Sequence, residues 1–324
     1  MAKLLQVSDL RVEFLTGRGT VRAVGGVAFQ LDRGEVFALV GESGCGKSTT
    51  ALAVMRLVPP PGRILGGSIR LRGDDLLTLD EDSMTQVRGR HIAMIFQNPM
   101  VSLNPVYRAG AQVQEAIVLD QVPKNEAWRR AVDLLGRVYI ADPAHRALSY
   151  PHELSGGMRQ RVMTGMMVSR QPDLLIADEP TTALDVTIQA QVLDLLLELR
   201  DRTGMALLII THDLGIVAEI ADRVGVMYAG SLVEQGPVFD IFEEPLHPYT
   251  RLLMRALPRL TKGQGSLHTI PGQVPSLIQL PPGCPFHPRC PDRMEICSTK
   301  MPGLTVPAGG REVACYLHGV GERQ

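Results

Sequence analysis

A glycine-rich stretch near the N-terminus has the residue types and spacing of a phosphate-binding loop. Gly41–Ser48 reads G-E-S-G-C-G-K-S and matches the pattern G-x-x-x-x-G-K-[ST]. It follows an expected buried strand, Val36–Val40, and opens an expected helix that runs from Lys47 to about Val58. Glycines let backbone N–H groups curl around phosphate oxygens, and the helix N-terminus favours an anion. We expect Lys47 to reach the β- and γ-phosphates of a nucleotide and Ser48 to hold Mg²⁺.

The whole loop and the residue after it are expected to contact that nucleotide. Cys45 stands at a variable position of the pattern, and we interpret it as a small loop residue rather than a nucleophile. A glycine-rich turn with a chance lysine is the alternative, which the flanking strand and helix argue against. The expected contact residues are Gly41, Glu42, Ser43, Gly44, Cys45, Gly46, Lys47, Ser48 and Thr49.

A second candidate site is a short apolar run that ends in two acidic residues. Leu174–Glu179 reads L-L-I-A-D-E, so four apolar residues bring a strand to the edge of a sheet and deliver two carboxylates there. In enzymes with a phosphate loop such an aspartate helps to hold Mg²⁺, the role expected for Asp178. Glu179 would orient or deprotonate the attacking water. A strand that ends in solvated acids is the alternative.

Strands and helices alternate along the chain in the way that produces a mainly parallel sheet covered by helices. A hairpin marked by Gly17 and Gly19 comes first, and a mainly helical stretch from about Asn98 to Arg170 interrupts the sheet. The expected strands are Leu4–Leu15, Val21–Leu31, Val36–Val40, Ile92–Phe96, Leu174–Ala177, Ala206–Ile210 and Val224–Tyr228, with a helix at Thr187–Thr203 that stops at Gly204.

The composition is that of an ordinary globular protein. Hydrophobic residues make up 45% of the 324 residues, charged residues make up 21%, and the formal net charge is -1. No basic field indicates a nucleic-acid partner, and no stretch approaches the ~18 consecutive apolar residues of a membrane span. No signal peptide is recognisable at the N-terminus. We therefore expect a cytoplasmic protein that serves a membrane only by docking to other chains.

Leu154–Gln160, which reads L-S-G-G-M-R-Q, resembles the signature motif L-S-G-G-Q of ABC ATPases, with Met158 in place of the usual glutamine. Ser155 is a good helix N-cap, and Gly156 and Gly157 leave backbone exposed at a helix start that favours anions. The resemblance implies that Ser155, Gly156 and Gly157 complete the ATP site of a partner subunit. The departure at Met158 is also similar to what one ATPase of such a pair carries.

Other landmarks resemble the same family and imply further site residues. Gln97 is similar to the residue that senses the γ-phosphate and Mg²⁺ at the start of the loop that contacts the membrane subunit. Asp185, in Ala183-Leu184-Asp185, is similar to the loop at the dimer seam, and His212 to the switch histidine. Phe14 would stack on adenine, with Phe29 or a backbone-only contact as alternatives. The implied catalytic residues are Glu179, His212, Gln97 and Lys47.

The resemblance covers about residues 4–260, and the tail narrows it. Glu243–Leu253 (E-E-P-L-H-P-Y-T-R-L-L) and the Cys/Pro-rich Gly283–His318 resemble ATPase subunits of bacterial dipeptide and oligopeptide importers, to which the nickel importers are similar. The implied fold is α/β: a P-loop ABC ATPase core, mainly a parallel sheet plus N-terminal antiparallel strands. An inserted helical subdomain and a small C-terminal appendage complete it. We expect domains at 1–260, with the helical subdomain at about 98–170, and at 261–324.

The resemblance also implies an activity and partners. The chain would hydrolyse ATP at the cytoplasmic face of the inner membrane, with a second, non-identical ATPase, two membrane permeases and an external substrate-binding protein. Chromosome-type ABC ATPases are disfavoured, because they insert long coiled coils where this sequence has no sustained heptads. Two-cassette translation factors are disfavoured by the single phosphate loop, and a dead regulatory subunit by the intact Lys47, Glu179 and His212.

The last segment holds four cysteines, Cys284, Cys290, Cys297 and Cys315, spaced C-x5-C-x6-C-x17-C. A reducing compartment makes disulfides improbable, and structural zinc sites use closer pairs than these. We expect an iron–sulfur cluster, 4Fe-4S, as a structural staple of a segment too short to bury much core. Zinc and four free thiols are the alternatives.

Overall fold

The computed structural model describes residues 3–97, 103–181, 186–256, 270–307 and 310–319. The chain divides into two units. The first unit comprises Met1–Thr78 together with Ile210–Gln324, and the second comprises Leu79–Ile209. Each unit is described by itself below.

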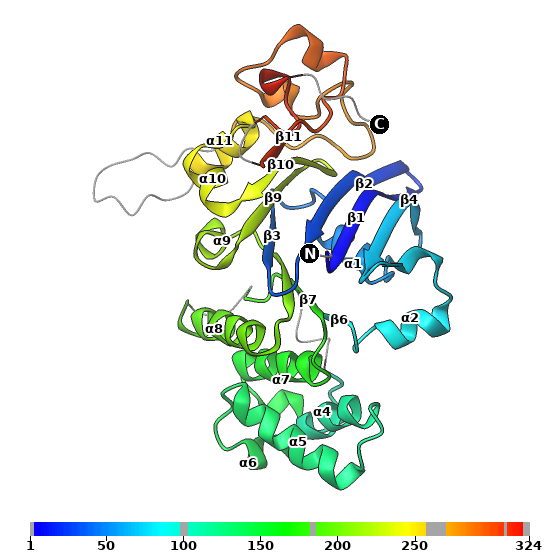
Figure 1. The fold of residues 1–324 in the computed structure, drawn as a ribbon, viewed down its shortest axis with the longest axis vertical. Helices are drawn as coiled ribbons and strands as arrows, with labels where there is room; N and C mark the ends of the chain where they lie inside the picture. The colour runs from blue at the N-terminus through cyan, green and yellow to red at the C-terminus, as the bar shows by residue number, and fades with distance from the viewer. Residues whose placement is uncertain (1–2, 98–102, 182–185, 257–269, 308–309, 320–324) are drawn as a thin grey trace, which may run out of the picture. The chain divides into compact units, whose positions relative to one another are not determined.

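An antiparallel sheet opens the first unit (Figure 1). Its strand order is β2-β1-β4-β5, and β1 pairs with both β2 and β4 in antiparallel register. The predicted hairpin between the first two strands is confirmed. The strands are β1 (Leu5–Thr16), β2 (Gly19–Leu31), β4 (Gly62–Leu71) and β5 (Asp74–Asp75).

A second set of strands in this unit carries the phosphate loop. β3 (Val36–Val40) lies parallel to β9 (Arg223–Tyr228), and β10 (Ser231–Pro237) and β11 (Glu312–Val313) continue in antiparallel register. All five residues of β3 are buried, as its apolar sequence predicts. The helices of the unit are α1 (Lys47–Val54), α9 (Leu214–Ile220), α10 (Val238–Glu243) and α11 (Pro248–Arg255).

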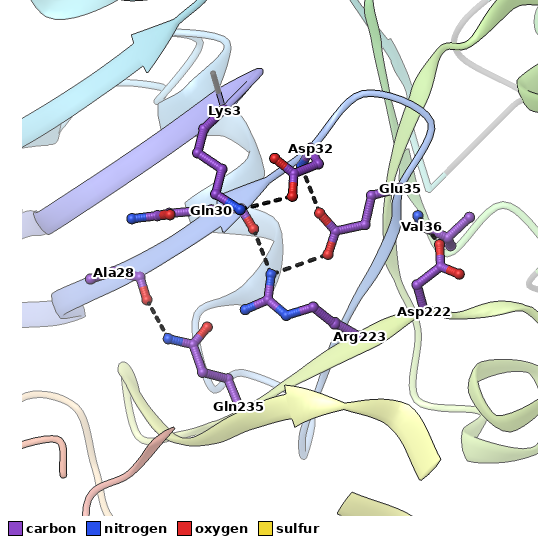
Figure 2. Close-up of polar contacts among 9 residues, drawn as sticks. All are labelled: Lys3, Ala28, Gln30, Asp32, Glu35, Val36, Asp222, Arg223 and Gln235. Atoms are coloured by element: carbon purple, nitrogen blue, oxygen red, sulfur yellow. Dashed lines mark hydrogen bonds and ion pairs between the residues drawn. The ribbon is translucent and has the colours of Figure 1, made fainter. Parts of the chain in front are cut away.

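Polar contacts tie β2 to the strands around β3 (Figure 2). The guanidinium of Arg223 donates to the backbone oxygen of Gln30 at 3.0 Å and to the carboxylate of Glu35 at 3.1 Å. The amide of Gln235 in β10 donates to the backbone oxygen of Ala28 in β2 at 3.1 Å. Fixed on both sides, the turn from β2 into β3 sets the direction in which the chain enters the phosphate loop.

The second unit places helices between two neighbouring parallel strands, which confirms the predicted helical insertion. β6 (Ile92–Ile95) pairs with β7 (Leu174–Asp178) in parallel register, and β8 (Ala206–Ile210), whose last residue belongs to the first unit, follows β7 in the strand order. The helices are α2 (Glu81–Val87), α4 (Ala109–Val118), α5 (Lys124–Arg137), α6 (Pro143–Ala147), α7 (Gly156–Val168) and α8 (Val186–Thr203).

The inserted helices share one apolar core. Val113 of α4, Ala131 and Leu135 of α5, Val162 of α7 and Leu195 of α8 are all at most 1% exposed and belong to one buried cluster. Figure 1 shows α4, α5 and α6 gathered beside α7. This packing fixes α7, the helix that begins with the signature motif.

The first helix ends earlier than its sequence predicts. α1 stops at Val54, not near Val58, because Arg56 takes a left-handed φ of 51°. The N–H of Leu57 then donates to the oxygen of Leu52, and that of Arg56 to Ala53, the hydrogen-bond pair of a Schellman motif. The helix is thus closed before the prolines that were expected to stop it.

Two further features of the structure bear on the expected domain boundaries and on membrane-spanning helices. The two units do not coincide with the domains expected at 1–260 and 261–324, because the tail falls into the first unit and the second unit begins at Leu79. The expected division rests on composition and stays a prediction. Of the helices in the described ranges, none combines the length and apolar character needed to cross a bilayer.

Candidate nucleotide-binding site

The phosphate loop has backbone angles that only glycine adopts easily. Gly41 and Gly46 have φ values of 149° and 105°. A Cβ at Gly41 would lie 2.2 Å from the backbone oxygen of Met227, and one at Gly46 would lie 2.3 Å from that of Ala23. Neighbouring strands therefore press directly against the loop, and the glycines are required by both angle and space.

Lys47 is buried inside this loop, at 6% exposure. Its ammonium donates to the backbone oxygens of Gly41 at 2.8 Å and Glu42 at 3.1 Å, and it lies 3.7 Å from the sulfur of Cys45. The charge is thus held where the loop curls, which is the position the motif predicts. Burial raises the pKa of the Cys45 thiol although Lys47 opposes the shift, so the thiol stays protonated.

Glu42 binds two residues that the sequence analysis did not identify. Its backbone N–H donates to the hydroxyl of Tyr249 at 3.0 Å, and its carboxylate accepts from the guanidinium of Arg289 at 2.8 and 3.1 Å. Arg289 lies 247 positions along the chain from Glu42. No local sequence pattern links residues so far apart, so only the fold could reveal the pair.

The acidic strand end lies in the second unit. Asp178 is the last residue of β7 and is 4% exposed, and Glu179 follows with a left-handed φ of 49°. The amide of Gln97 donates to the carboxylate of Glu179 at 2.9 Å. Gln97 and Glu179, predicted independently, are therefore brought together, whereas Lys47 and Ser48 lie in the other unit. That Ser48, Gln97 and Asp178 meet at one Mg²⁺ stays a prediction.

The signature motif begins α7 as predicted. Ser155 is the N-cap residue, and its hydroxyl accepts from the N–H of Met158 at 3.3 Å. Ser155 and Gly156 are exposed, and no atom of the described residues beyond its own helix and chain neighbours lies within 4 Å of a Cβ built on Gly156. The amide of Gln160 donates to the oxygen of Pro180 at 2.8 Å, which ties the helix to the end of β7. The helix start thus presents open backbone from a firmly held element.

The remaining predicted residues have different outcomes. His212 is exposed in the turn between β8 and α9, and its role as a switch residue stays a prediction. Phe14 is half-buried, and its ring packs against Gly62. A Cβ added to Gly62 would lie 2.5 Å from that ring. Phe29 is 2% exposed and stacks on Phe37 at 5.3 Å, which favours Phe14 over Phe29 as the residue on adenine. Asp185 lies outside the described residues.

The four C-terminal cysteines line one small cavity. Its other walls include the apolar side chains of Phe286, Met294, Pro302 and Leu317, and the N–H of Cys284 donates to the oxygen of Cys297 at 2.8 Å. Burial, and then repulsion from the neighbouring thiols, raises the pKa of Cys284 to about 11, and the same causes raise the pKa of Cys315 to about 11.

Residue type and shared location therefore fit a soft metal centre, because thiolates in apolar surroundings select such ions and clusters. Within the described part of the chain, however, no three Cys, His, Asp or Glu side chains are arranged as the ligands of a metal ion.

Comparison with known proteins identifies the class. A family model described as ABC transporter matches residues 24–182, and one described as oligopeptide/dipeptide transporter, C-terminal region, matches residues 233–297. The CbiO1 structure from Clostridium perfringens, part of the ABC transporter complex CbiONQ, has a TM-score of 0.65 at 28% identity, covering 75% of this chain and 92% of that one.

Two relatives match along nearly the whole chain. The dipeptide transport ATP-binding protein DppD of Bacillus subtilis is 48% identical over 319 residues, which cover 98% of this chain and 95% of that protein. The oligopeptide transport ATP-binding protein OppD of Mycobacterium tuberculosis is 51% identical over 318 residues, which cover 97% of this chain and 52% of that protein.

The chain therefore belongs to the ABC transporter family and has the fold of its ATPase cassettes. Within that family it carries the C-terminal region of the oligopeptide and dipeptide transporters, as the sequence of the tail predicts. It is an ATP-hydrolysing subunit that uses ATP and Mg²⁺.

Proposed function

We propose that this chain powers a bacterial importer of dipeptides or oligopeptides by coupling ATP hydrolysis to movements of separate membrane subunits. Identity of about one half along almost the whole length to a dipeptide transport ATP-binding protein supports this function most directly. The match of residues 233–297 to the oligopeptide/dipeptide transporter region supports the same substrate class. The second candidate is an importer of nickel or another small solute, because the tail of this chain also resembles that of the nickel importers.

Isolation of the assembled transporter tests the substrate class. The tagged full chain is purified from membranes of its own cells in mild detergent, and associated proteins are identified by mass spectrometry. We expect a second ATPase, two permeases and a binding protein that retains labelled peptides. A binding protein that retains nickel and ignores peptides would assign the chain to the second candidate.

For hydrolysis we propose a division of labour among the predicted residues. Lys47 binds the β- and γ-phosphates from within the loop, and Ser48, Asp178 and Gln97 would hold the Mg²⁺ that neutralises phosphate charge. Glu179 accepts a proton from the water that attacks the γ-phosphorus, and ADP leaves with the β–γ bridging oxygen. Gln97 orients Glu179 through the 2.9 Å hydrogen bond. His212 senses the γ-phosphate, and Phe14 stacks on adenine.

A shared site follows from the exposed start of α7. We propose that Ser155, Gly156 and Gly157 bind the γ-phosphate held by a partner ATPase, with Asp185 at the seam between the two subunits. The partner is a second, non-identical ATPase, and the pair docks on two permeases at the cytoplasmic face of the inner membrane. The ATPase domain comprises residues 1–260, with a helical subdomain at about 98–170, and the appendage comprises 261–324.

We propose that the four C-terminal cysteines hold a 4Fe-4S cluster that staples the appendage. Their shared, largely apolar cavity supports this, and zinc is the alternative. Anaerobically purified full chain should be brown, with broad visible absorbance and about four iron and four sulfide per chain. Cys290→Ser should lose this absorbance, whereas Cys45→Ser should keep it. A colourless protein with one zinc per chain would overturn the cluster.

A further inference from the structure

Glu42, the second residue of the phosphate loop, uses all of its polar groups within the first unit. Its backbone oxygen accepts from the ammonium of Lys47 at 3.1 Å. Its backbone N–H donates to Tyr249, and its carboxylate binds the guanidinium of Arg289 through both oxygens. One residue therefore links Lys47 both to Tyr249, near the end of the proposed ATPase domain, and to Arg289 of the appendage.

The guanidinium of Arg289 is held in place by the appendage itself. Its Nε donates to the oxygen of Pro271 at 2.8 Å, and its Nη2 donates to that of Ile270 at 3.3 Å. Its Nη1 lies 3.3 Å from the hydroxyl of Tyr228. The side chain is only 5% exposed, against 26% for Glu42. A bidentate ion pair that is this well buried fixes the orientation of the Glu42 carboxylate much better than an exposed pair would.

The same residue is part of the cysteine-bearing segment. Arg289 ends a short 3-10 helix, His287–Arg289, that lies between Cys284 and Cys290. The N–H of His287 donates to Cys284 and the N–H of Cys290 donates to His287, at 3.0 and 3.3 Å. The position of the guanidinium is therefore set by the backbone around two of the four thiols.

We propose that Arg289 is a positioning residue for the phosphate loop, through which the appendage sets the affinity of this chain for Mg·ATP. The proposal rests on the function proposed above only in that Gly41–Ser48 binds ATP. In this role Arg289 acts through Glu42 and not on the nucleotide. It holds Glu42 so that the loop and Lys47 are already arranged when the nucleotide arrives, and such preorganisation lowers the entropy lost on binding.

Titration of the full chain with a fluorescent ATP analogue and Mg²⁺ tests this. Arg289→Ala and Glu42→Ala should each weaken binding roughly tenfold, and the double variant should be no weaker than either single one, because both remove the same interaction. Arg289→Lys should recover part of the affinity, since an ammonium can pair with Glu42 but cannot also hold Pro271.

Arg251→Ala is the matched control. Arg251 pairs with Asp292 of the appendage at 3.4 Å, and this pair is about two-fifths exposed. Among the described residues, neither side chain hydrogen-bonds to the phosphate loop. Its loss should change the affinity by less than about twofold. An effect as large as that of Arg289→Ala would indicate general loosening of the appendage and would overturn the proposal.

Lys47→Ala separates this inference from the proposed nucleotide site. If Lys47→Ala abolishes binding while Arg289→Ala and Glu42→Ala leave it unchanged, the positioning role is wrong and the ATP site stands. If Lys47→Ala, Arg289→Ala and Glu42→Ala all bind ATP normally, the proposed ATP site and the positioning role are both wrong.

A double variant whose loss of affinity is the product of the two single losses would also refute the coupling between Arg289 and Glu42. Should Arg289→Ala fail to fold by circular dichroism, Glu42→Ala and Arg289→Lys decide the question, because Glu42 is partly exposed.

Discussion

At the scale of single residues, the carboxylate of Glu179 combines an unusual backbone angle with one defined hydrogen bond. Its φ of 49° is uncommon for a residue with a side chain, and such strain persists only where the surroundings impose it. The 2.9 Å hydrogen bond from Gln97 then selects one orientation of the carboxylate. This arrangement suits a group that must face one water molecule.

Glu179→Gln tests the proposed base. The new amide keeps the shape and can still accept from Gln97, but it cannot take the proton of the attacking water. We expect phosphate release by the assembled transporter to fall by about 10²- to 10⁴-fold, with ATP binding retained. Turnover close to that of the unmodified protein would rule out Glu179 as the base.

The glycines of the phosphate loop allow a second residue-level test. Gly46→Ala would place a Cβ 2.3 Å from the oxygen of Ala23 at a φ of 105°. Gly44→Ala is the control, because Gly44 has a positive φ of 77° but no atom within 4 Å of an added Cβ.

We expect Gly44→Ala to cost about 1–2 kcal/mol of backbone strain and to weaken ATP binding moderately. Gly46→Ala adds a steric overlap with backbone and should abolish measurable binding in the same titration. Equal effects of the two variants would mean that contact with the β2 strand does not shape the loop.

At the scale of elements, the start of α7 carries two functions on one hydroxyl. Ser155 caps the helix, and its exposed position is proposed to face the phosphate of a partner subunit. Ser155→Ala should cost about 1 kcal/mol of unfolding free energy. Ser155→Asp should keep the cap but place a carboxylate toward phosphate, so the ATPase rate should fall further than in Ser155→Ala although stability is retained.

Urea unfolding and phosphate release by the assembled transporter measure the two effects. Ser169→Ala is the control at the other end of the same helix, where the hydroxyl donates to the oxygen of Met166 at 2.7 Å. It should leave the ATPase rate unchanged. Full activity of Ser155→Asp would place this helix start away from any nucleotide.

Elements with a strong local pattern were predictable, and others were not. β3 matches its expected range, Val36–Val40, because an uninterrupted buried strand leaves an uninterrupted apolar run. β4 was missed, since Gly62–Leu71 contains three glycines and pairs along a partly exposed sheet. α1 was predicted too long because its stop depends on a left-handed arginine, a residue type with no preference for that conformation.

The candidate site shows the same division. Motif spacing predicted Lys47, Asp178 and Glu179, whereas the family resemblance implied Gln97. Glu179 and Gln97 prove to be hydrogen-bonded. Arg289 could not be predicted in this way, because an arginine among prolines and cysteines has no distinctive local pattern. Its role depends on a partner 247 residues earlier, a contact that arises only when the chain is folded.

At the scale of the whole molecule, the proposed ATP site is incomplete in a single chain. The isolated protein should therefore hydrolyse ATP on the order of 10²-fold more slowly than the assembled transporter, because the γ-phosphate lacks the donors of a partner's signature helix. Phosphate release measured beside light-scattering mass tests this. Full-rate hydrolysis by a chain shown to be monomeric would refute the shared site.

The pairing of Glu42 with Arg289 also sets a delay during synthesis of the chain, because the two residues are made far apart in time. A ribosome that has added Glu42 must add 247 more residues before the matching guanidinium exists, which takes roughly 12–50 s at bacterial and eukaryotic synthesis rates. If Arg289 positions the loop as proposed, the loop binds nucleotide weakly throughout that interval. A chain truncated before residue 289 never forms this ion pair. Tight ATP binding therefore distinguishes chains whose translation passed Arg289 from truncated ones.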